Sequence, residues 1–212
     1  IHSSLLFAVM PSTWYTRRVV LDSIMLPFIL TSILLILETK IRPNYVNMLS
    51  LLSGVSLGLA VFTKIPSFTM IPLLVYLILQ VGERRPLLSK NALRKIALFL
   101  IPVIIIPLIW PTYALLSGDL DQWFDGVIWQ ATNRQSEDKT LFDVGLSFLR
   151  SDPVILILGA IGILYLTIRR EFIGIIWIIP YLALLYLVGW VNHFHFILII
   201  PILCISLAKM IH

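Results

Sequence analysis

The feature that most restricts this chain is a series of apolar runs, each near the length that crosses a bilayer, separated by polar breaks. A membrane-spanning helix needs about 20 mostly apolar residues. Such runs occupy residues 3–16, 19–37, 46–63, 65–81, 96–116, 153–168, 172–191 and 194–211. With 59% hydrophobic and 13% charged residues, the chain is too apolar for a water-soluble domain around one core. We therefore predict an all-α, polytopic transmembrane protein with about 7–8 membrane helices.

Residues 1–212 are predicted to form a single transmembrane domain, in which the polar stretch 117–152 is a long external loop. The chain starts at Ile1 with a short apolar run, so we expect a fragment that lacks the N-terminal part of a larger membrane domain. Cys204 is the only cysteine, which excludes an internal disulfide. The net charge of +5 does not indicate nucleic-acid binding, because the basic residues flank apolar runs.

The distribution of Lys and Arg predicts the orientation, because cytoplasmic loops retain positive charge. Threading the runs alternately places ten basic and three acidic residues on one side, and six basic and eight acidic residues on the other. The first side is predicted to be the cytoplasm. On the other side we expect the loop 117–152 to meet a group of candidate site residues, namely Arg17, Arg18, Asp22, Lys64, His193 and His195.

These residue types suit a ligand that carries a phosphate, since Arg offers a planar fork of donors and Lys a point charge. Each also has a structural interpretation. Arg18 and Asp22 are four apart and would neutralise each other on a helix, and Lys64 would reach the lipid headgroups. His193 and His195 are two apart and point in different directions on a helix, so joint metal binding would need an extended turn. We predict no metal site.

The aromatic residues Trp123, Phe124 and Trp129 lie within the predicted loop. They form either an aromatic belt or an amphipathic helix on the membrane surface, or else a platform for stacking a sugar. The nearby acids follow the pattern D-L-D-Q-W-F-D, which lacks the glycine and the terminal glutamate of a calcium-binding hand.

Three motifs carry a resemblance to a known family. Residues 11–28 read P-S-T-W-Y-T-R-R-V-V-L-D-S-I-M-L-P-F, residues 53–66 read S-G-V-S-L-G-L-A-V-F-T-K-I-P, and residues 193–201 read H-F-H-F-I-L-I-I-P. They resemble segments of the GT-C glycosyltransferases, especially the protein O-mannosyltransferase and aminoarabinose transferase branch. Aligned on Asp22, the family arginine falls on Arg17, whereas Arg18 takes a usually aromatic position, which leaves open which arginine acts. Lys64 matches the family lysine, and the third motif is the weakest match.

The resemblance implies a multi-pass enzyme that moves a mannose-like sugar from a polyprenyl- or dolichyl-phosphate carrier. The acceptor would be a protein or a glycolipid on the non-cytoplasmic side of the cell membrane. Arg17, Lys64 and one of the two histidines would stabilise the departing lipid phosphate. Asp22 would orient an arginine or help to hold a divalent cation, the one cofactor that the resemblance allows. The family's acidic residue is expected upstream of residue 1, so we expect this fragment to be inactive alone.

Two other classes of protein remain open. A transporter or flippase for an anionic or lipid-linked substrate would place charged residues near the bilayer midplane on interrupted helices, often with internal repeats. In this sequence the candidate charges collect at one interface, and no repeat is evident. A non-catalytic subunit of a membrane assembly would leave the polar cluster at residues 11–22 unexplained.

Overall fold

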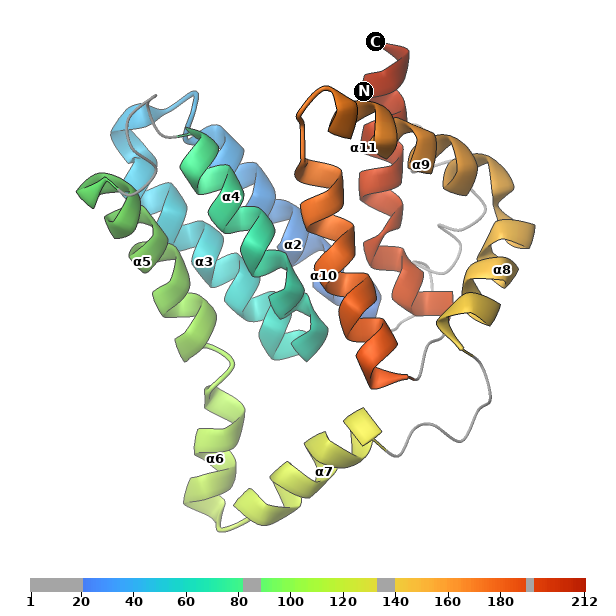
Figure 1. The fold of residues 1–212 in the computed structure, drawn as a ribbon. Coiled ribbons are helices and arrows are strands. Elements are labelled where there is room, and N and C mark those ends of the chain that lie inside the picture. Colours follow the sequence, from blue (N-terminus) through green and yellow to red (C-terminus); the bar gives the residue numbers. More distant parts are fainter. Residues whose placement is uncertain (1–20, 82–88, 133–139, 190–192) are drawn as a thin grey trace. The chain divides into compact units, whose positions relative to one another are not determined.

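The computed structural model describes residues 21–81, 89–132, 140–189 and 193–212, and throughout these ranges the regular elements are helices (Figure 1). The predicted all-α, polytopic fold is confirmed. The chain divides into two compact units. The N-terminal unit is Ile24–Val127, and the C-terminal unit is Ile128–His212 together with the residues up to Ser23. Each unit has its own helix packing.

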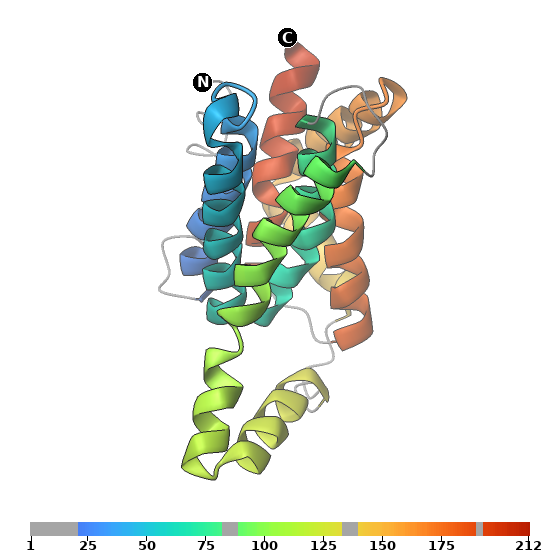
Figure 2. The ribbon, with the colours of Figure 1, turned by 90° about the vertical axis from the view of Figure 1, so that its left-hand side faces the viewer.

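The N-terminal unit is built around four helices that lie side by side, and two further helices extend away from them (Figures 1 and 2). The four are α2 (Leu21–Glu38), α3 (Val46–Thr63), α4 (Ile71–Val81) and α5 (Lys90–Ile105). The 3₁₀ helices η2 (Pro43–Tyr45) and η3 (Ile65–Met70) precede α3 and α4. Beyond α5 come α6 (Ile109–Ser117) and α7 (Leu120–Thr132).

Glycines on one face of α3 let its backbone approach α5 closely. A Cβ atom at Gly54 would stand 2.1 Å from the Phe99 carbonyl oxygen, and one at Gly58 would stand 2.7 Å from the Pro102 carbonyl oxygen. Both distances are shorter than any van der Waals contact. The pair is a G-x-x-x-G arrangement, which allows close packing of membrane helices.

Serines on another face of α3 join it to α2. The hydroxyl oxygens of Ser32 and Ser53 are 2.8 Å apart, and each lies 2.9 Å from the carbonyl oxygen of the other residue. Ser56 donates to the Phe28 carbonyl at 2.8 Å. Ser32 and Ser53 are fully buried, so these bonds satisfy polar groups that would otherwise be costly in an apolar interior.

The C-terminal unit consists of α8 (Leu141–Ser151), α9 (Pro153–Ile168), α10 (Ile173–Val188), η5 (His193–Leu198) and α11 (Ile200–Ile211). Glycines again permit close packing, here between α9 and α11. A Cβ at Gly159 would stand 2.7 Å from the Leu203 Cβ, and one at Gly162 would stand 2.7 Å from the Ser206 carbonyl carbon.

Two aromatic side chains of α10 hold η5 through its main-chain carbonyls. Trp177 donates from Nε1 to the Leu198 carbonyl at 2.9 Å, and Tyr181 donates from its hydroxyl to the His195 carbonyl at 2.9 Å. Both aromatic side chains are buried. From α8, the Phe148 ring stacks on Phe196 of η5, with 5.1 Å between the ring centroids.

Three segments of the described chain are long and apolar enough to cross a bilayer: Leu21–Glu38, Pro43–Thr63 and Lys90–Ser117. A fourth exists only if α8 and α9, which meet at a bend of 110°, form one broken span. Ile65–Gln80, Ile173–Val188 and His195–Ile211 are apolar but shorter. Within the described residues, three or four segments therefore have the length of a full span, and the other apolar helices are shorter.

The stretch 117–152, which we predicted as a loop, is largely helical where it is described. It contains α7 and α8, and α8 starts with a capping box. The Thr140 hydroxyl accepts from the Asp143 N–H at 3.2 Å, and the Asp143 carboxylate accepts from the Thr140 N–H at 3.0 Å. The Thr140 hydroxyl also donates to that carboxylate at 2.6 Å, and these bonds lower the pKa of Asp143. The polar residues occupy helix faces and ends, which is why composition alone suggested a loop.

Candidate functional site

Lys64 occupies a break between two helices of the N-terminal unit. Its backbone is extended, with φ −154° and ψ 114°, between the end of α3 and the start of η3. The Lys64 N–H donates to the Ala60 carbonyl at 2.9 Å, and the Lys64 carbonyl accepts from the hydroxyl of buried Ser67 at 2.8 Å. Pro66 suits the first turn of η3 because it lacks an N–H that would need a partner there. The break is therefore a fixed structure that holds a half-buried lysine at the helix end.

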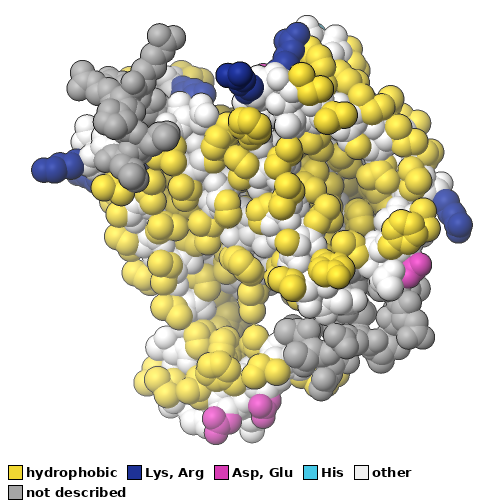
Figure 3. All heavy atoms as spheres, in the orientation of Figure 1, with side chains coloured by type: hydrophobic (Ala, Val, Ile, Leu, Met, Phe, Trp, Pro, Cys, Tyr) yellow, Lys and Arg dark blue, Asp and Glu magenta, His cyan; other side chains and the backbone are white. Residues whose placement is uncertain are grey.

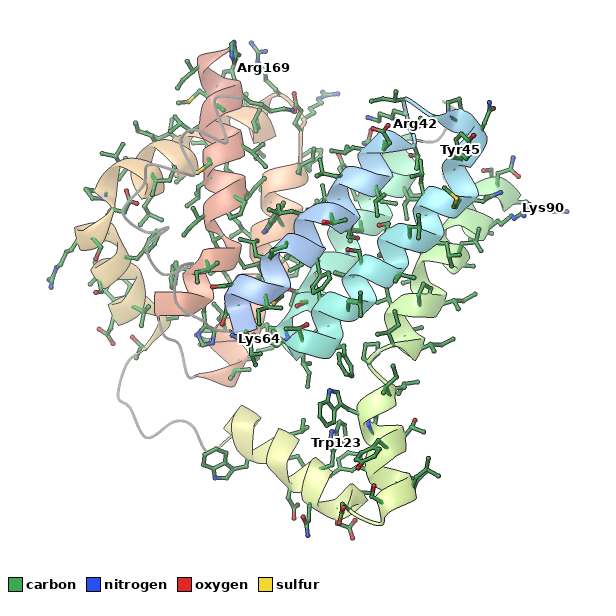
Figure 4. The ribbon with its side chains drawn as sticks, turned by 180° about the vertical axis from the view of Figure 1, so that it is seen from behind. Arg42, Tyr45, Lys64, Lys90, Trp123 and Arg169 are labelled. Atoms are coloured by element: carbon green, nitrogen blue, oxygen red, sulfur yellow. The ribbon has the colours of Figure 1, made fainter. Side chains whose placement is uncertain are left out.

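Lys64 and the basic turns lie at opposite ends of the N-terminal unit. Figure 4 shows Arg42, Tyr45 and Lys90 at one end and Lys64 at the other. Between the ends, the visible surface of these helices is mostly hydrophobic (Figure 3). Arg42 is paired with Glu38 at 2.7 Å in an exposed i,i+4 ion pair, which contributes little to stability. The separation agrees with the alternate threading of the runs over this unit.

In the C-terminal unit, several polar side chains are buried. Asp22, in the first turn of α2, is 2% exposed. The Tyr181 phenol donates to the main-chain carbonyl of His195, a residue that is 6% exposed. Two predicted site residues, Asp22 and His195, are thus both buried within this unit. A buried ionisable residue beside apolar helices is costly, so these residues are candidates for function.

Asp152 is a second buried acid of the C-terminal unit and is not one of the predicted site residues. It lies at the bend between α8 and α9, where its carboxylate accepts from the Ile155 N–H at 3.5 Å as the N-cap of α9. The Asp-Pro pair at 152–153 is a signal for a helix start, whereas no sequence signal marks Tyr181 within its apolar run.

The remaining predicted site residues fall outside what is described. Arg17 and Arg18 precede residue 21, and of His193 only the main chain in η5 is described. Lys64 belongs to one unit and Asp22 and His195 to the other, so their predicted gathering stays a prediction. The described residues contain no group of three or more His, Cys, Asp or Glu side chains that could hold a metal ion. The help that Asp22 would give in holding a divalent cation therefore also stays a prediction.

The described sites contain a half-buried lysine in one unit and buried acidic and histidine side chains in the other. Lys64 brings a point charge to the end of a bundle whose flanks are apolar, a setting in which charge attraction to a phosphate is screened less than in bulk water. A molecule with an apolar tail and a phosphate head would match apolar flanks and a terminal cation.

Apolar helices of bilayer length, with cations at their ends and acids buried at helix starts, define a polytopic α-helical membrane protein. The sequence model of the family described as dolichyl-phosphate-mannose-protein mannosyltransferase matches residues 1–110, just over half of the chain. The chain belongs to this family of GT-C membrane glycosyltransferases. The match contains the motifs around Asp22 and Lys64 but not the one at His193–Pro201. Comparisons with curated proteins and with solved structures gave no match.

Proposed function

We propose that this protein transfers a mannose-like sugar from a polyprenyl- or dolichyl-phosphate carrier to an acceptor on the non-cytoplasmic side of the cell membrane. Membership of the mannosyltransferase family supports a dolichyl-linked donor. The observation that carries the proposal is the position of Lys64 at a fixed break, at the end of the N-terminal unit opposite Arg42 and Lys90. A protein hydroxyl or a glycolipid hydroxyl would serve as the acceptor.

In the proposed reaction, the bond between the sugar C1 and the carrier phosphate oxygen breaks, and the acceptor oxygen forms the new bond to C1. The acceptor hydroxyl gives its proton to a general base, and the lipid phosphate leaves with an additional negative charge. The Lys64 ammonium interacts most strongly with that phosphate when the charge develops. An interaction that grows stronger toward the transition state raises the rate of the chemical step.

The other predicted residues have supporting roles in the proposal. Arg17 or Arg18 provides a second cation for the phosphate, since guanidinium binds two phosphate oxygens at once. Asp22 orients an arginine, which would explain a carboxylate kept buried at the start of α2. His195 and His193 are proposed to contact the phosphate or the sugar from the η5 segment.

The experiment compares two lysines of the same unit, in membranes from cells that express the complete gene. Lys64→Met should reduce transfer from a radiolabelled polyprenyl-phosphate mannose by roughly 10²-fold, the usual cost of losing one group that stabilises developing charge. Lys90→Met, at the opposite end of the unit, is the matched control and should transfer at the wild-type rate. Both variants should insert and extract in detergent like the wild type.

Transfer by Lys64→Met at the wild-type rate would refute the phosphate role of Lys64. Transfer from polyprenyl-phosphate donors that carry different sugars then distinguishes a role of Lys64 at the phosphate from a role at the sugar. Loss of activity toward all phosphate-linked donors is expected if Lys64 acts on the phosphate. Loss toward mannose alone would mean that the lysine reads the sugar, and it would contradict the proposal.

A further inference from the structure

Helix α7 has one apolar face and one polar face. Leu120, Trp123, Phe124 and Val127 recur at the three- and four-residue spacing that forms a single helix stripe. Phe124 is 51% exposed, and its ring meets Trp123 edge-on, with 5.2 Å between the centroids. The other three members of the stripe are half-buried, so its Phe124 edge is not covered by a packed core in its own unit.

The position of α7 along the chain places its start at one end of a candidate membrane span. The segment Lys90–Ser117 is 28 residues long, and at about 1.5 Å per helical residue it exceeds the roughly 30 Å of bilayer hydrocarbon. Gly118 then adopts a left-handed conformation with φ 80°, which ends α6, and α7 begins two residues later. The chain therefore enters α7 at headgroup depth. Figure 4 shows Trp123 on α7, outside the bundle formed by the other helices of the unit.

The charge on α7 favours a zwitterionic lipid surface over an anionic one. The polar residues of its start are Asp119, Asp121 and Asp125, all exposed, and no Lys or Arg occurs from Gly118 to Thr132. Helices that bind anionic membranes carry the opposite pattern, with Lys and Arg on the polar face. Three carboxylates would be repelled by anionic lipids but are compatible with zwitterionic headgroups, whose ammonium groups lie outermost.

We propose that α7 lies in the headgroup layer of a zwitterionic phospholipid leaflet, with Phe124 toward the acyl chains and Asp121 and Asp125 toward water. The bilayer is then the partner of the apolar face, and α7 forms a shelf at the end of the Lys90–Ser117 span. This surface is independent of the proposed chemistry at Lys64.

Spin labels on the two faces test this placement in the complete protein, reconstituted in phosphatidylethanolamine and phosphatidylcholine vesicles. Buried Cys204 is the only cysteine, so Cys204→Ala provides a background for Phe124→Cys and Asp125→Cys. The label at 124 should collide more with oxygen, which concentrates in lipid, and the label at 125 more with a water-soluble nickel chelate. Greater nickel collision at both positions would overturn the proposal, as would shielding of position 124 from both probes, which indicates protein contact.

A second arm tests the lipid preference. Replacing part of the zwitterionic lipid with phosphatidylglycerol should reduce the oxygen preference at position 124 at least twofold. The triple variant Asp119→Asn, Asp121→Asn, Asp125→Asn should keep that preference at every lipid composition. An oxygen preference that does not change with phosphatidylglycerol in the protein with all three aspartates would contradict the proposed selectivity.

Discussion

The two helical units use the same device to bring helices together and different devices to satisfy polar groups between them. Gly54 and Gly58 allow α5 to pack closely against α3. In the same way, Gly159 and Gly162 allow α11 to pack closely against α9. Beyond the glycines the units diverge. The N-terminal unit joins two regular helices through short serine hydroxyls, whereas the C-terminal unit holds the 3₁₀ segment η5 with long aromatic donors.

The two units also differ in where they hold charged side chains. The polar side chains buried in the N-terminal unit are serine and threonine hydroxyls, and its Lys64 stands at the break between α3 and η3. The C-terminal unit interrupts its helices at η5 and at Asp152, and it buries polar side chains at both places. The buried charged residues of the C-terminal unit therefore lie inside its packing, whereas Lys64 is half-buried at a helix end.

The largest expected effect comes from adding a methyl group at a glycine contact. Gly54→Ala should lower the free energy of unfolding in detergent by about 3 kcal/mol, the upper part of the range for overpacking, because its Cβ would meet the Phe99 carbonyl oxygen. Gly162→Ala should cost less, since its nearest contact is 2.7 Å rather than 2.1 Å. Gly126→Ala is the control, because no atom lies within 4 Å of its Cβ. Equal free energies of unfolding for the three variants would contradict the role of close glycine contacts in both units.

A smaller effect is expected when an aromatic donor is removed from the C-terminal unit. Tyr181→Phe leaves the buried His195 carbonyl without its side-chain donor and should cost about 2 kcal/mol. Tyr186→Phe on the same helix is the matched control, because Tyr186 is 76% exposed. Chemical unfolding of both variants measures the difference. If Tyr181→Phe unfolds like the control, aromatic donors do not hold η5.

The serine contact of the N-terminal unit should couple more weakly. In a double-mutant cycle, Ser32→Ala and Ser53→Ala should show a coupling of about 0.6 kcal/mol, the average for side-chain hydrogen bonds between membrane helices. The cycle is read from the unfolding free energies of the two single variants and the double variant. A coupling as large as the Tyr181→Phe effect would mean that the two units do not differ in the way described.

The smallest effect concerns the cap of α8, in the stretch predicted to lie outside the membrane. Bonds from the Thr140 hydroxyl and N–H lower the pKa of Asp143 below its ordinary value of 3.8. The capping contribution is therefore fully present above pH 3.8 and is lost as the pH falls through the lowered pKa. Hydrogen exchange of the first-turn amides should show this loss, and in Thr140→Val it should begin at higher pH. Identical pH profiles would contradict the capping box.

Much of the fold was predictable because proline and charged residues mark helix ends. The runs 46–63 and 153–168 coincide with α3 and α9. The run 96–116 was expected to be one helix but is divided at residues 106–108, where Pro107 lacks the N–H that an α-helix needs. In the stretch 117–152, the structure has α7 at the aromatic residues for which an amphipathic helix was one alternative, and α8 after it.

The candidate site was predictable only where local sequence fixes local structure. The T-K-I-P motif at residues 63–66 indicated a break with a lysine, and the break is present. The hydrogen bond of Tyr181 was not predictable, because it forms only when α10 packs against η5. A tyrosine inside an apolar run looks like an ordinary core residue until its partner is known.

The most direct test of the account is to restore a charge at position 64 by chemistry. In the Cys204→Ala background, Lys64→Cys should lose transfer from polyprenyl-phosphate mannose in sealed vesicles. Reaction with aminoethyl methanethiosulfonate, which attaches an ammonium group, should restore transfer, whereas the sulfonate analogue, which attaches a negative charge, should not. Wild-type transfer by the unmodified variant, or the same activity after both reagents, would contradict a cation at residue 64 acting on the lipid phosphate.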